Sequence, residues 1–136
     1  MQVQRMIAAH PNVSGVVDDV LIRAIEACYD CAQACTSCAD ACLAEDMVKD
    51  LRQCIRLGLD CADICLATGA VASRRTGSDP LVTRNLLEVC AEACQACRAE
   101  CAKHARMEHC VICADACRRC EQLCRGAAGN LATTLQ

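Results

Sequence analysis

The sequence predicts an all-α protein, an up-down-up-down four-helix bundle with a cysteine-lined core. Cysteine fills 17 of the 136 positions, and most cysteines follow one another at steps of three or four residues, which keep side chains on one face of an α-helix. The chain has no Trp, no Phe and one Tyr, so small side chains must fill the seam between helices. Short connections separate four such helical stretches, and helices joined by short loops pack as antiparallel neighbours.

The cysteines form four runs, one in each predicted long helix. These runs are Cys28, Cys31, Cys35, Cys38 and Cys42; Cys54, Cys61 and Cys65; Cys90, Cys94, Cys97 and Cys101; and Cys110, Cys113, Cys117, Cys120 and Cys124. Leu and Ile occupy such positions in an ordinary bundle. Free cysteine often behaves as a small hydrophobe, but Ala, Val or Leu would pack the seam without the risk of oxidation. The number of cysteines therefore favours thiols that bind something.

The first half of the chain is predicted to hold an N-terminal segment and two long helices. Residues 1–13 form that segment, with a short helix from Met1 to Ala9. The bundle is expected over residues 14–126. Its first helix begins with Ser14 as N-cap and runs to about Ala44, and its second spans about Asp46 to Ser73.

The second half is predicted to hold the other two long helices and a tail. The third helix runs from Pro80, which suits a first helical turn, to about His104. The fourth spans about Met107 to Arg125, and two glycines, Gly126 and Gly129, are expected to mark its end. Residues 127–136 are then a C-terminal tail.

The predicted topology gives the two ends of the bundle different chemistry. The first and third connections lie at the same end, which brings Met47, His104, Met107 and His109 together. His and Met ligate soft or borderline metals, so this end is predicted to be an opening with His104, His109 and Met47 as candidate ligands. The other end is expected to be plugged by apolar residues: Val17, Leu21, Ala24, Ala72 and Leu87.

The second helix departs from the regular cysteine ladder. Between Cys54 and Cys61 the inward position falls on Leu57 or Gly58, so one level lacks a sulfur on that side. Two interpretations remain open here. Gly58 either makes room for a neighbouring side chain or a bulky metal cluster, or is a neutral change at a tolerant position.

Composition restricts the class of protein. The formal net charge is −3 and the pI about 5.5, with both signs interspersed, which argues against a nucleic-acid surface. No apolar run reaches membrane-spanning length, and the N-terminus does not read as a secretory signal. A cytoplasmic protein is expected, where thiols stay reduced. Neighbouring thiols on one helix face also have poor geometry for disulfides.

Charge favours Cu(I) as the bound ion. Thiols bind metals as thiolates, and an uncompensated buried anion is costly. Tetrahedral zinc at four sulfurs per dication would leave a strongly negative core, whereas a monovalent ion at about one per sulfur replaces each proton with no change of charge. Soft thiolates select Cu(I), which predicts on the order of ten to twenty ions per chain.

Two alternatives with other metals remain. A Zn(II) or Cd(II) thiolate buffer or detoxification protein is the first, although such chains lack an apolar, helix-forming background. An iron–sulfur electron carrier is the second, but its compact cysteine run ends before a proline, and no cysteine here precedes one. The sequence shows no catalytic triad, no phosphate-binding glycine loop and no inward pair of carboxylates, so no enzyme activity is expected.

From residue 14 to residue 125 the chain resembles a cytosolic copper storage protein, of the cysteine-rich four-helix-bundle copper-binding family. The ladders Cys28 to Cys42, Cys90 to Cys101 and Cys110 to Cys124 carry the resemblance. It implies storage of many Cu(I) ions along the core, an opening lined by His or Met, and assembly into a homotetramer. The partners expected of such a store are a copper chaperone or a copper-requiring enzyme, with no nucleic acid and no membrane.

Overall fold

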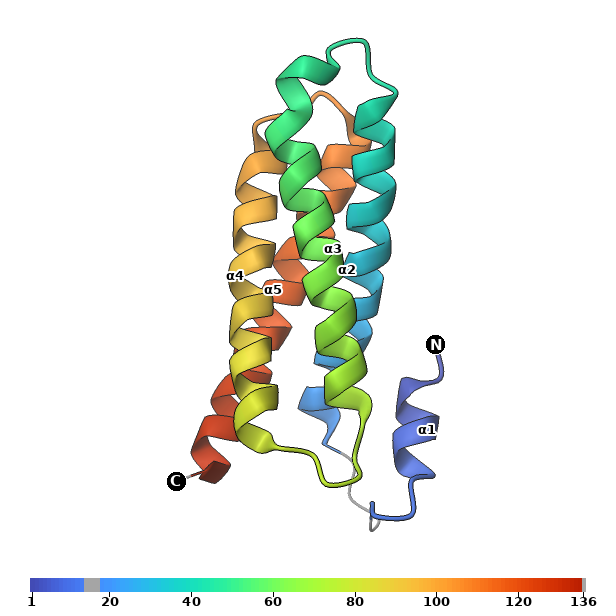
Figure 1. The fold of residues 1–136 in the computed structure, drawn as a ribbon, viewed down its shortest axis with the longest axis vertical. Helices are drawn as coiled ribbons and strands as arrows, with labels where there is room; N and C mark the ends of the chain where they lie inside the picture. The colour runs from blue at the N-terminus through green and yellow to red at the C-terminus, as the bar shows by residue number, and fades with distance from the viewer. Residues whose placement is uncertain (14–17, 136) are drawn as a thin grey trace.

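Four long antiparallel helices form the body of the protein (Figure 1). The computed structural model describes residues 1–13 and 18–135, and side chains as far as residue 131. Its elements are α1 (Val3–Ala8), α2 (Asp19–Leu43), the 3₁₀ turn η1 (Val48–Leu51), α3 (Arg52–Ser73), α4 (Pro80–Ala102) and α5 (Glu108–Leu135). The described residues contain no strand. The predicted all-α class and the short N-terminal helix are confirmed.

The long helices are arranged in a ring in which each packs against two others. Helix α2 lies beside α3 and α5, and α4 lies beside the same two helices. Because consecutive helices run in opposite directions (Figure 1), the predicted up-down-up-down topology is confirmed. The α2–η1 and α4–α5 turns meet at one end of the bundle, which we call the mouth. The α3–α4 loop and the start of α2 lie at the other end, the closed end.

An aspartate side chain caps the N-terminus of two of the long helices. Helix α2 starts after Asp18, whose carboxylate accepts a hydrogen bond from the Leu21 amide at 3.2 Å. The predicted N-cap Ser14 and the predicted plug residue Val17 lie outside the described residues. Helix α4 has Asp79 as its N-cap and Pro80 in its first turn. Pro80 was expected in the first turn, because proline has no amide hydrogen and the first amides of a helix have no partner within the helix.

The second and third helices are shorter than predicted at the mouth. The second was expected from about Asp46, but the chain first makes the separate 3₁₀ turn Val48–Leu51. This turn places Leu51 in the core with none of its surface exposed, and burial of a leucine contributes about 2 kcal/mol. The third was expected to reach about His104, whereas α4 ends at Ala102 with Lys103 as its C-cap.

The predicted end of the fourth helix is wrong. Helix α5 continues through Gly126 and Gly129 to Leu135, so the segment predicted as a tail is largely helical. A glycine that ends a helix adopts a positive φ, and among the described residues only Gly77 does so, with φ of 60°. Ala127 and Ala128 are each 2% exposed. Their burial against the bundle offsets the cost of two helical glycines, about 1 kcal/mol each.

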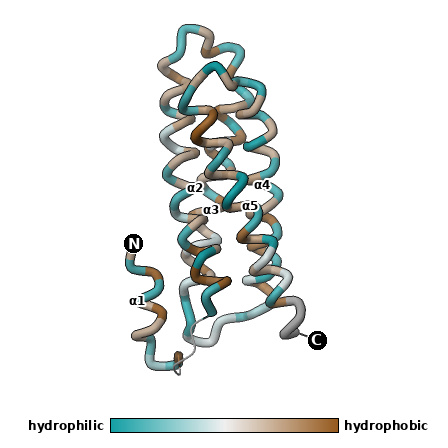
Figure 2. The backbone as a smooth tube through the Cα atoms, turned by 180° about the vertical axis from the view of Figure 1, so that it is seen from behind, coloured by the Kyte–Doolittle hydropathy of each residue, from teal (hydrophilic) through white to brown (hydrophobic). Residues whose placement is uncertain are grey.

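The closed end is filled with hydrocarbon, as the sequence predicted. Four of the predicted plug residues are described and all are buried: Leu21, Ala24, Ala72 and Leu87. Ile25 joins them with no exposed surface. Along the helices, hydrophobic and hydrophilic residues alternate (Figure 2). None of the described helices is long and apolar enough to cross a bilayer.

Tyr29 packs against the bundle rather than pointing freely into solvent. A Cβ atom added at Gly69 would lie 3.1 Å from Cε2 of the Tyr29 ring and 3.2 Å from its Cζ. Gly69 therefore allows the ring to lie directly against the backbone of α3. On its other side, Tyr29 and α1 residues including Val3 and Ile7 line a shared cavity of about 390 Å³. Tyr29 therefore packs between α3 and the N-terminal helix α1.

Candidate metal centre

All 17 cysteines are free thiols buried in the interior of the bundle. No cysteine side chain is more than 4% exposed. Each run lies on the inward face of its helix because its three- and four-residue steps match the helical period. The four faces meet on the bundle axis, so the thiols form one column of sulfur from the closed end to the mouth.

At the closed end, the column begins with a group of four thiols from three helices. Cys28 of α2, Cys90 of α4, and Cys120 and Cys124 of α5 have sulfurs within 4.8 Å of one another. The Cys28 sulfur lies 3.5 Å from that of Cys124 and 3.9 Å from that of Cys90. Cys65 of α3 continues the column, with its sulfur 3.6 Å from that of Cys90.

In the middle of the bundle, two further groups share Cys31 and Cys61. They are Cys31, Cys61, Cys65 and Cys94, and Cys31, Cys35, Cys61 and Cys117. Because the groups have members in common, an ion held by one group shares thiolates with an ion held by the next. Bridging of this kind is what a continuous metal–thiolate array requires.

Gly58 marks a level at which α3 supplies no sulfur. The group at this level consists of Cys35, Cys97, Cys113 and Cys117, from α2, α4 and α5. A Cβ atom at Gly58 would lie 3.5 Å from the Cys35 carbonyl oxygen, an ordinary van der Waals contact. A small side chain such as alanine would therefore fit at this position, which favours the interpretation of Gly58 as a neutral change.

Cysteines of α4 continue the series of sulfur contacts at the level of Gly58. The Cys97 sulfur lies 4.0 Å from that of Cys101, which lies 3.7 Å from that of Cys54. These contacts extend the sulfur column past Gly58 as far as Cys54 and Cys101. Nearer the mouth, the Cys38 sulfur lies 3.9 Å from that of Cys110.

The spacing of the sulfurs suits metal ions that bind three or four thiolates. A metal–sulfur bond of about 2.3 Å places neighbouring sulfurs about 3.8 Å apart around a tetrahedral ion and about 4.0 Å apart around a trigonal one. The sulfur–sulfur contacts here span 3.5 to 4.0 Å. Two-coordinate linear binding needs about 4.6 Å, which small side-chain rotations would provide. The groups can accept such ions without movement of the helices.

Burial favours the neutral thiols over thiolates. It raises the pKa of Cys42 to about 12, with repulsion from Cys54 and Cys110 adding to the effect. Burial likewise raises the pKa of Cys110. A hydrogen bond between two thiols shifts their pKa values in opposite directions. Cys101 lowers the pKa of Cys54 to about 3, whereas Cys113, Cys38 and Cys54 raise the pKa of Cys101. Such paired effects act in opposite directions on the two partners, whereas burial raises the pKa of both Cys42 and Cys110.

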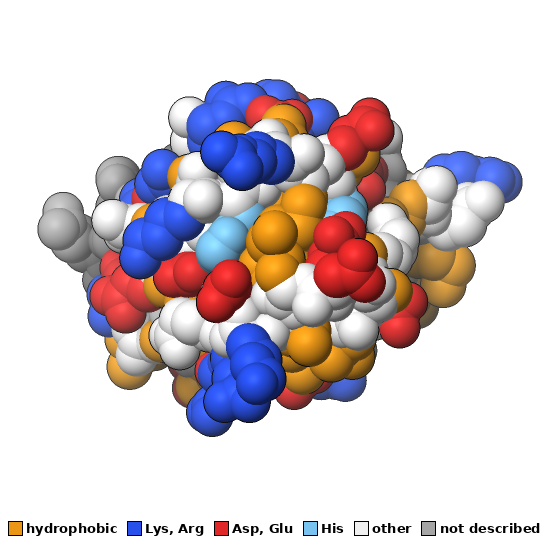
Figure 3. Space-filling view, turned by 90° about the horizontal axis from the view of Figure 1, so that it is seen from above, with side chains coloured by type: hydrophobic (Ala, Val, Ile, Leu, Met, Phe, Trp, Pro, Cys, Tyr) orange, Lys and Arg blue, Asp and Glu red, His pale blue; other side chains and the backbone are white. Residues whose placement is uncertain are grey.

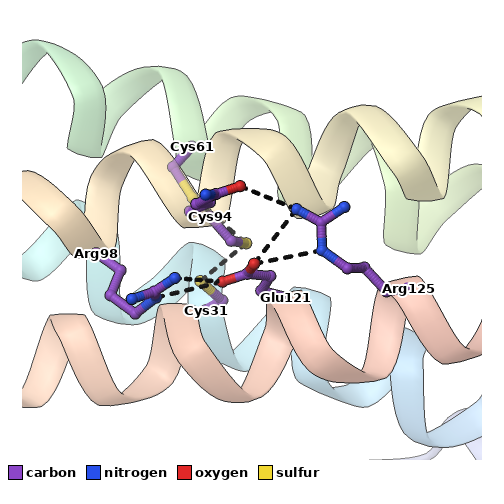
Figure 4. Close-up of polar contacts among 7 residues, drawn as sticks. Cys31, Cys61, Cys94, Arg98, Glu121 and Arg125 are labelled. Atoms are coloured by element: carbon purple, nitrogen blue, oxygen red, sulfur yellow. Dashed lines mark hydrogen bonds and ion pairs between the residues drawn. The ribbon is translucent and has the colours of Figure 1, made fainter.

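A cluster of paired charged groups lies on the outside of the bundle, beside the sulfur column. The Glu121 carboxylate accepts hydrogen bonds from Arg98 at 2.9 Å and from Arg125 at 3.3 Å, and Arg125 also donates to Gln95 (Figure 4). This cluster ties α4 to α5 on the outside of the bundle. The thiols drawn beside it bond to one another. The two arginines thus neutralise the Glu121 carboxylate on the outside of the sulfur column.

The last group of the column lies at the mouth and includes a histidine. Cys38, Cys42, Cys110 and His109 have ligand atoms within 4.8 Å of one another. Nδ1 of His109 lies 3.4 Å from the Cys38 sulfur and 3.6 Å from the Cys110 sulfur. Its other nitrogen, Nε2, lies 3.2 Å from a carboxylate oxygen of Glu45. Sequence reasoning singled out His109 but not Glu45, which had no signal beyond its place in a connection.

The other candidates at the mouth make different contacts. Nε2 of His104 lies 3.0 Å from Glu100, one turn earlier on α4. Met47 is 53% exposed at the start of η1, and Met107 packs against the core. Seen from this end, histidine side chains lie on both sides of a hydrophobic area, with Asp and Glu nearby (Figure 3). Metal binding by Met47 and His104 stays a prediction.

At the closed end Thr68 follows Cys65 at helical spacing and is 1% exposed. Its hydroxyl donates to the Ile64 carbonyl at 2.7 Å. Bonding of this kind to the preceding turn is the common arrangement for a helical threonine. Hydrocarbon from the plug residues lies beyond it, so the sulfur column ends here.

Comparison with known proteins gives consistent matches along most of the chain. A family model described as copper storage protein matches residues 18–129. The uncharacterized cysteine-rich protein YhjQ of Bacillus subtilis is 42% identical over 104 residues, which cover 76% of this chain and 92% of that protein.

Two solved structures are similar in both sequence and fold. The copper storage protein Ccsp of Streptomyces lividans, loaded with 10 copper equivalents, is 53% identical with a TM-score of 0.89, covering 93% of this chain and 98% of that one. The Cu(I)-bound copper storage protein BsCsp3 is 41% identical with a TM-score of 0.70, covering 77% of this chain and 94% of that one.

Proposed function

The chain belongs to the copper storage protein family, and from this premise we propose that it stores many Cu(I) ions on the thiolates of its sulfur column. The observation that carries the proposal is the series of buried sulfur contacts of 3.5 to 4.0 Å that follows the bundle axis from Cys28 to Cys54. Soft thiolates select Cu(I) among the abundant metals. Each ion that enters releases a proton from a thiol, so the interior stays close to neutral whether empty or full.

The ligands proposed are the 17 cysteines, together with His109 at the mouth. Sulfurs shared between neighbouring groups would bridge adjacent ions, which supports a capacity on the order of ten to twenty Cu(I) per chain. Ions would enter and leave at the mouth, because the closed end is filled by buried hydrocarbon such as Leu87 and Ile25.

The compartment, the assembly and the partners are proposed from the similarity to the relatives. The chain acts as a cytosolic store and not as an enzyme, since its buried thiols are arranged to hold ions. We further propose a homotetramer, with a copper chaperone as donor or a copper-requiring enzyme as recipient. Exposed apolar side chains on the outer faces of α3 and α4, such as Leu59, Leu66 and Val89, are available for contacts between subunits.

Competition between Cu(I) and Zn(II) tests the proposal. We expect the reduced protein, titrated without oxygen against a colorimetric Cu(I) chelator, to withdraw on the order of ten to twenty ions per chain before saturation. Ultraviolet charge-transfer bands should report Cu(I)–thiolate bonds, and an excess of Zn(II) should not displace them. Saturation at one or two Cu(I), or displacement by Zn(II), would favour the zinc or cadmium buffer instead.

A further inference from the structure

At the mouth, an acidic residue from one turn meets a histidine from another helix. Glu45 follows the end of α2, where its amide donates to the Cys42 carbonyl at 3.2 Å. His109 is in the first turn of α5. Their side chains meet with 3.2 Å between Oε1 of Glu45 and Nε2 of His109. The pair thus connects two helices that are far apart in sequence.

The two nitrogens of His109 face groups of opposite character. An ionised carboxylate only accepts hydrogen bonds, so Nε2 must carry the proton that it shares with Glu45. In the neutral ring, Nδ1 then keeps its lone pair, and this nitrogen faces the sulfurs of Cys38 and Cys110 at 3.4 and 3.6 Å. A lone pair directed at two thiols can bind a soft cation with them, whereas an N–H in the same place would repel it.

We propose that Glu45 is a positioning residue for copper loading: it fixes the tautomer and the orientation of His109 so that Nδ1 faces the first thiols of the column. Carboxylates that orient a metal-binding histidine in this way typically affect metal affinity or activity by about 10- to 100-fold when they are removed. The inference rests on the proposed function of Cu(I) storage.

Exposure supports a role for this pair at the start of loading. The side chains of His109 and Glu45 are 25% and 37% exposed, while the neighbouring sulfurs of Cys38 and Cys110 are buried. An ion that arrives from solvent therefore reaches His109 before it reaches a thiol. The imidazole passes the ion inward only when its Nδ1 lone pair points at the column.

His104 provides an internal comparison. It also has a carboxylate partner, with Nε2 3.0 Å from Glu100, but that partner lies four residues earlier on the same helix. The pair is the usual local contact of a helix surface. His109, in contrast, contacts two cysteine sulfurs of the column. Glu100→Gln is therefore a matched control for Glu45→Gln.

The tautomer can be read directly by nitrogen NMR of the reduced, copper-free protein. We expect His109 to carry its proton on Nε2 in the parent protein. In Glu45→Gln we expect a mixture of tautomers, because the amide of glutamine can also donate to Nε2. Glu100→Gln should leave the His109 signals unchanged. A parent protein with the proton on Nδ1 of His109, or a Glu45→Gln protein with the parental tautomer, would overturn the proposal.

Loading kinetics supply the second readout. Cu(I) transferred from a chelator complex in stopped flow should enter Glu45→Gln on the order of tenfold more slowly than the parent, with an unchanged final capacity. Glu100→Gln should load at the parental rate. Equal rates in all three proteins, or equal slowing in both variants, would contradict the proposal. A parent protein that takes up no Cu(I) would instead reject the storage function, and the NMR result would still report on the tautomer.

Discussion

Raising the pH of the reduced, copper-free protein from 8 to 10 is expected to unfold it. The pKa of a thiol in an unfolded chain is about 8.5, whereas burial raises that of Cys42 in the folded protein to about 12. A group whose folded pKa is higher contributes its full stability below the unfolded pKa and loses it as the pH rises towards the folded value. The window for Cys42 is therefore about pH 8.5 to 12.

The size of this effect follows from the number of buried thiols. One pKa unit corresponds to about 1.4 kcal/mol, so at pH 10 Cys42 alone costs about 2 kcal/mol of stability. Burial also raises the pKa of Cys110, which adds to this loss, and the free energy of unfolding of an ordinary domain is only about 5 to 15 kcal/mol. The transition should be cooperative and visible as loss of helical circular dichroism.

Two controls make the alkaline experiment decisive. The same chain loaded with Cu(I) should stay helical over this pH range, because its sulfurs are already thiolates and have no proton to lose. Return to pH 7 under reducing conditions should restore the helices of the copper-free protein. A copper-free protein that keeps its full helical signal at pH 10 would show that its thiols are not held neutral by burial.

Copper loading is expected to raise the resistance of the fold to guanidinium by about 2 M or more. A ligand that binds only the folded state stabilises it by about 2.7 kcal/mol per site when it is present at 100 times its dissociation constant. Four such sites already contribute about 10 kcal/mol. With a denaturant dependence of about 2 to 5 kcal/mol per M, this gain moves the unfolding midpoint by several molar units.

The control for this experiment is removal of the metal from the same sample. A strong Cu(I) chelator should return the midpoint to that of the copper-free protein, which excludes oxidation of thiols as the cause. Partially loaded samples should show intermediate midpoints as the number of bound ions rises. An unfolding midpoint that does not depend on copper would mean that the metal binds outside the folded core.

The fold and the composition of the sulfur column could be predicted because the pattern is local. Steps such as Cys28 to Cys31 and Cys31 to Cys35 determine which side of a helix the sulfurs occupy. Short connections then determine that neighbouring helices are antiparallel. These two facts suffice to put thiols from different helices together, as in the contact of 3.5 Å between Cys28 and Cys124.

Features that depend on contacts between distant segments could not be predicted in the same way. Gly126 was expected to end a helix, but helix α5 continues beyond it, and Ala127 and Ala128 are buried against the bundle. Glu45 looked like an ordinary turn residue, and only the packing of α2 beside α5 brings it to His109. The exposed Met47 shows the reverse case: its place near the mouth was expected, but the 3₁₀ turn leaves its side chain half exposed.

The central claim is that copper ions replace protons along a column of sulfur inside the bundle. Anomalous diffraction from crystals of the fully loaded protein, recorded at the copper absorption edge, tests it most directly. The account predicts a series of copper peaks along the bundle axis, from the level of Cys28 and Cys124 to that of Cys38 and His109, with peaks on both sides of Gly58. A loaded crystal whose copper peaks lie on the outer surface, with no peak between the four helices, would contradict it.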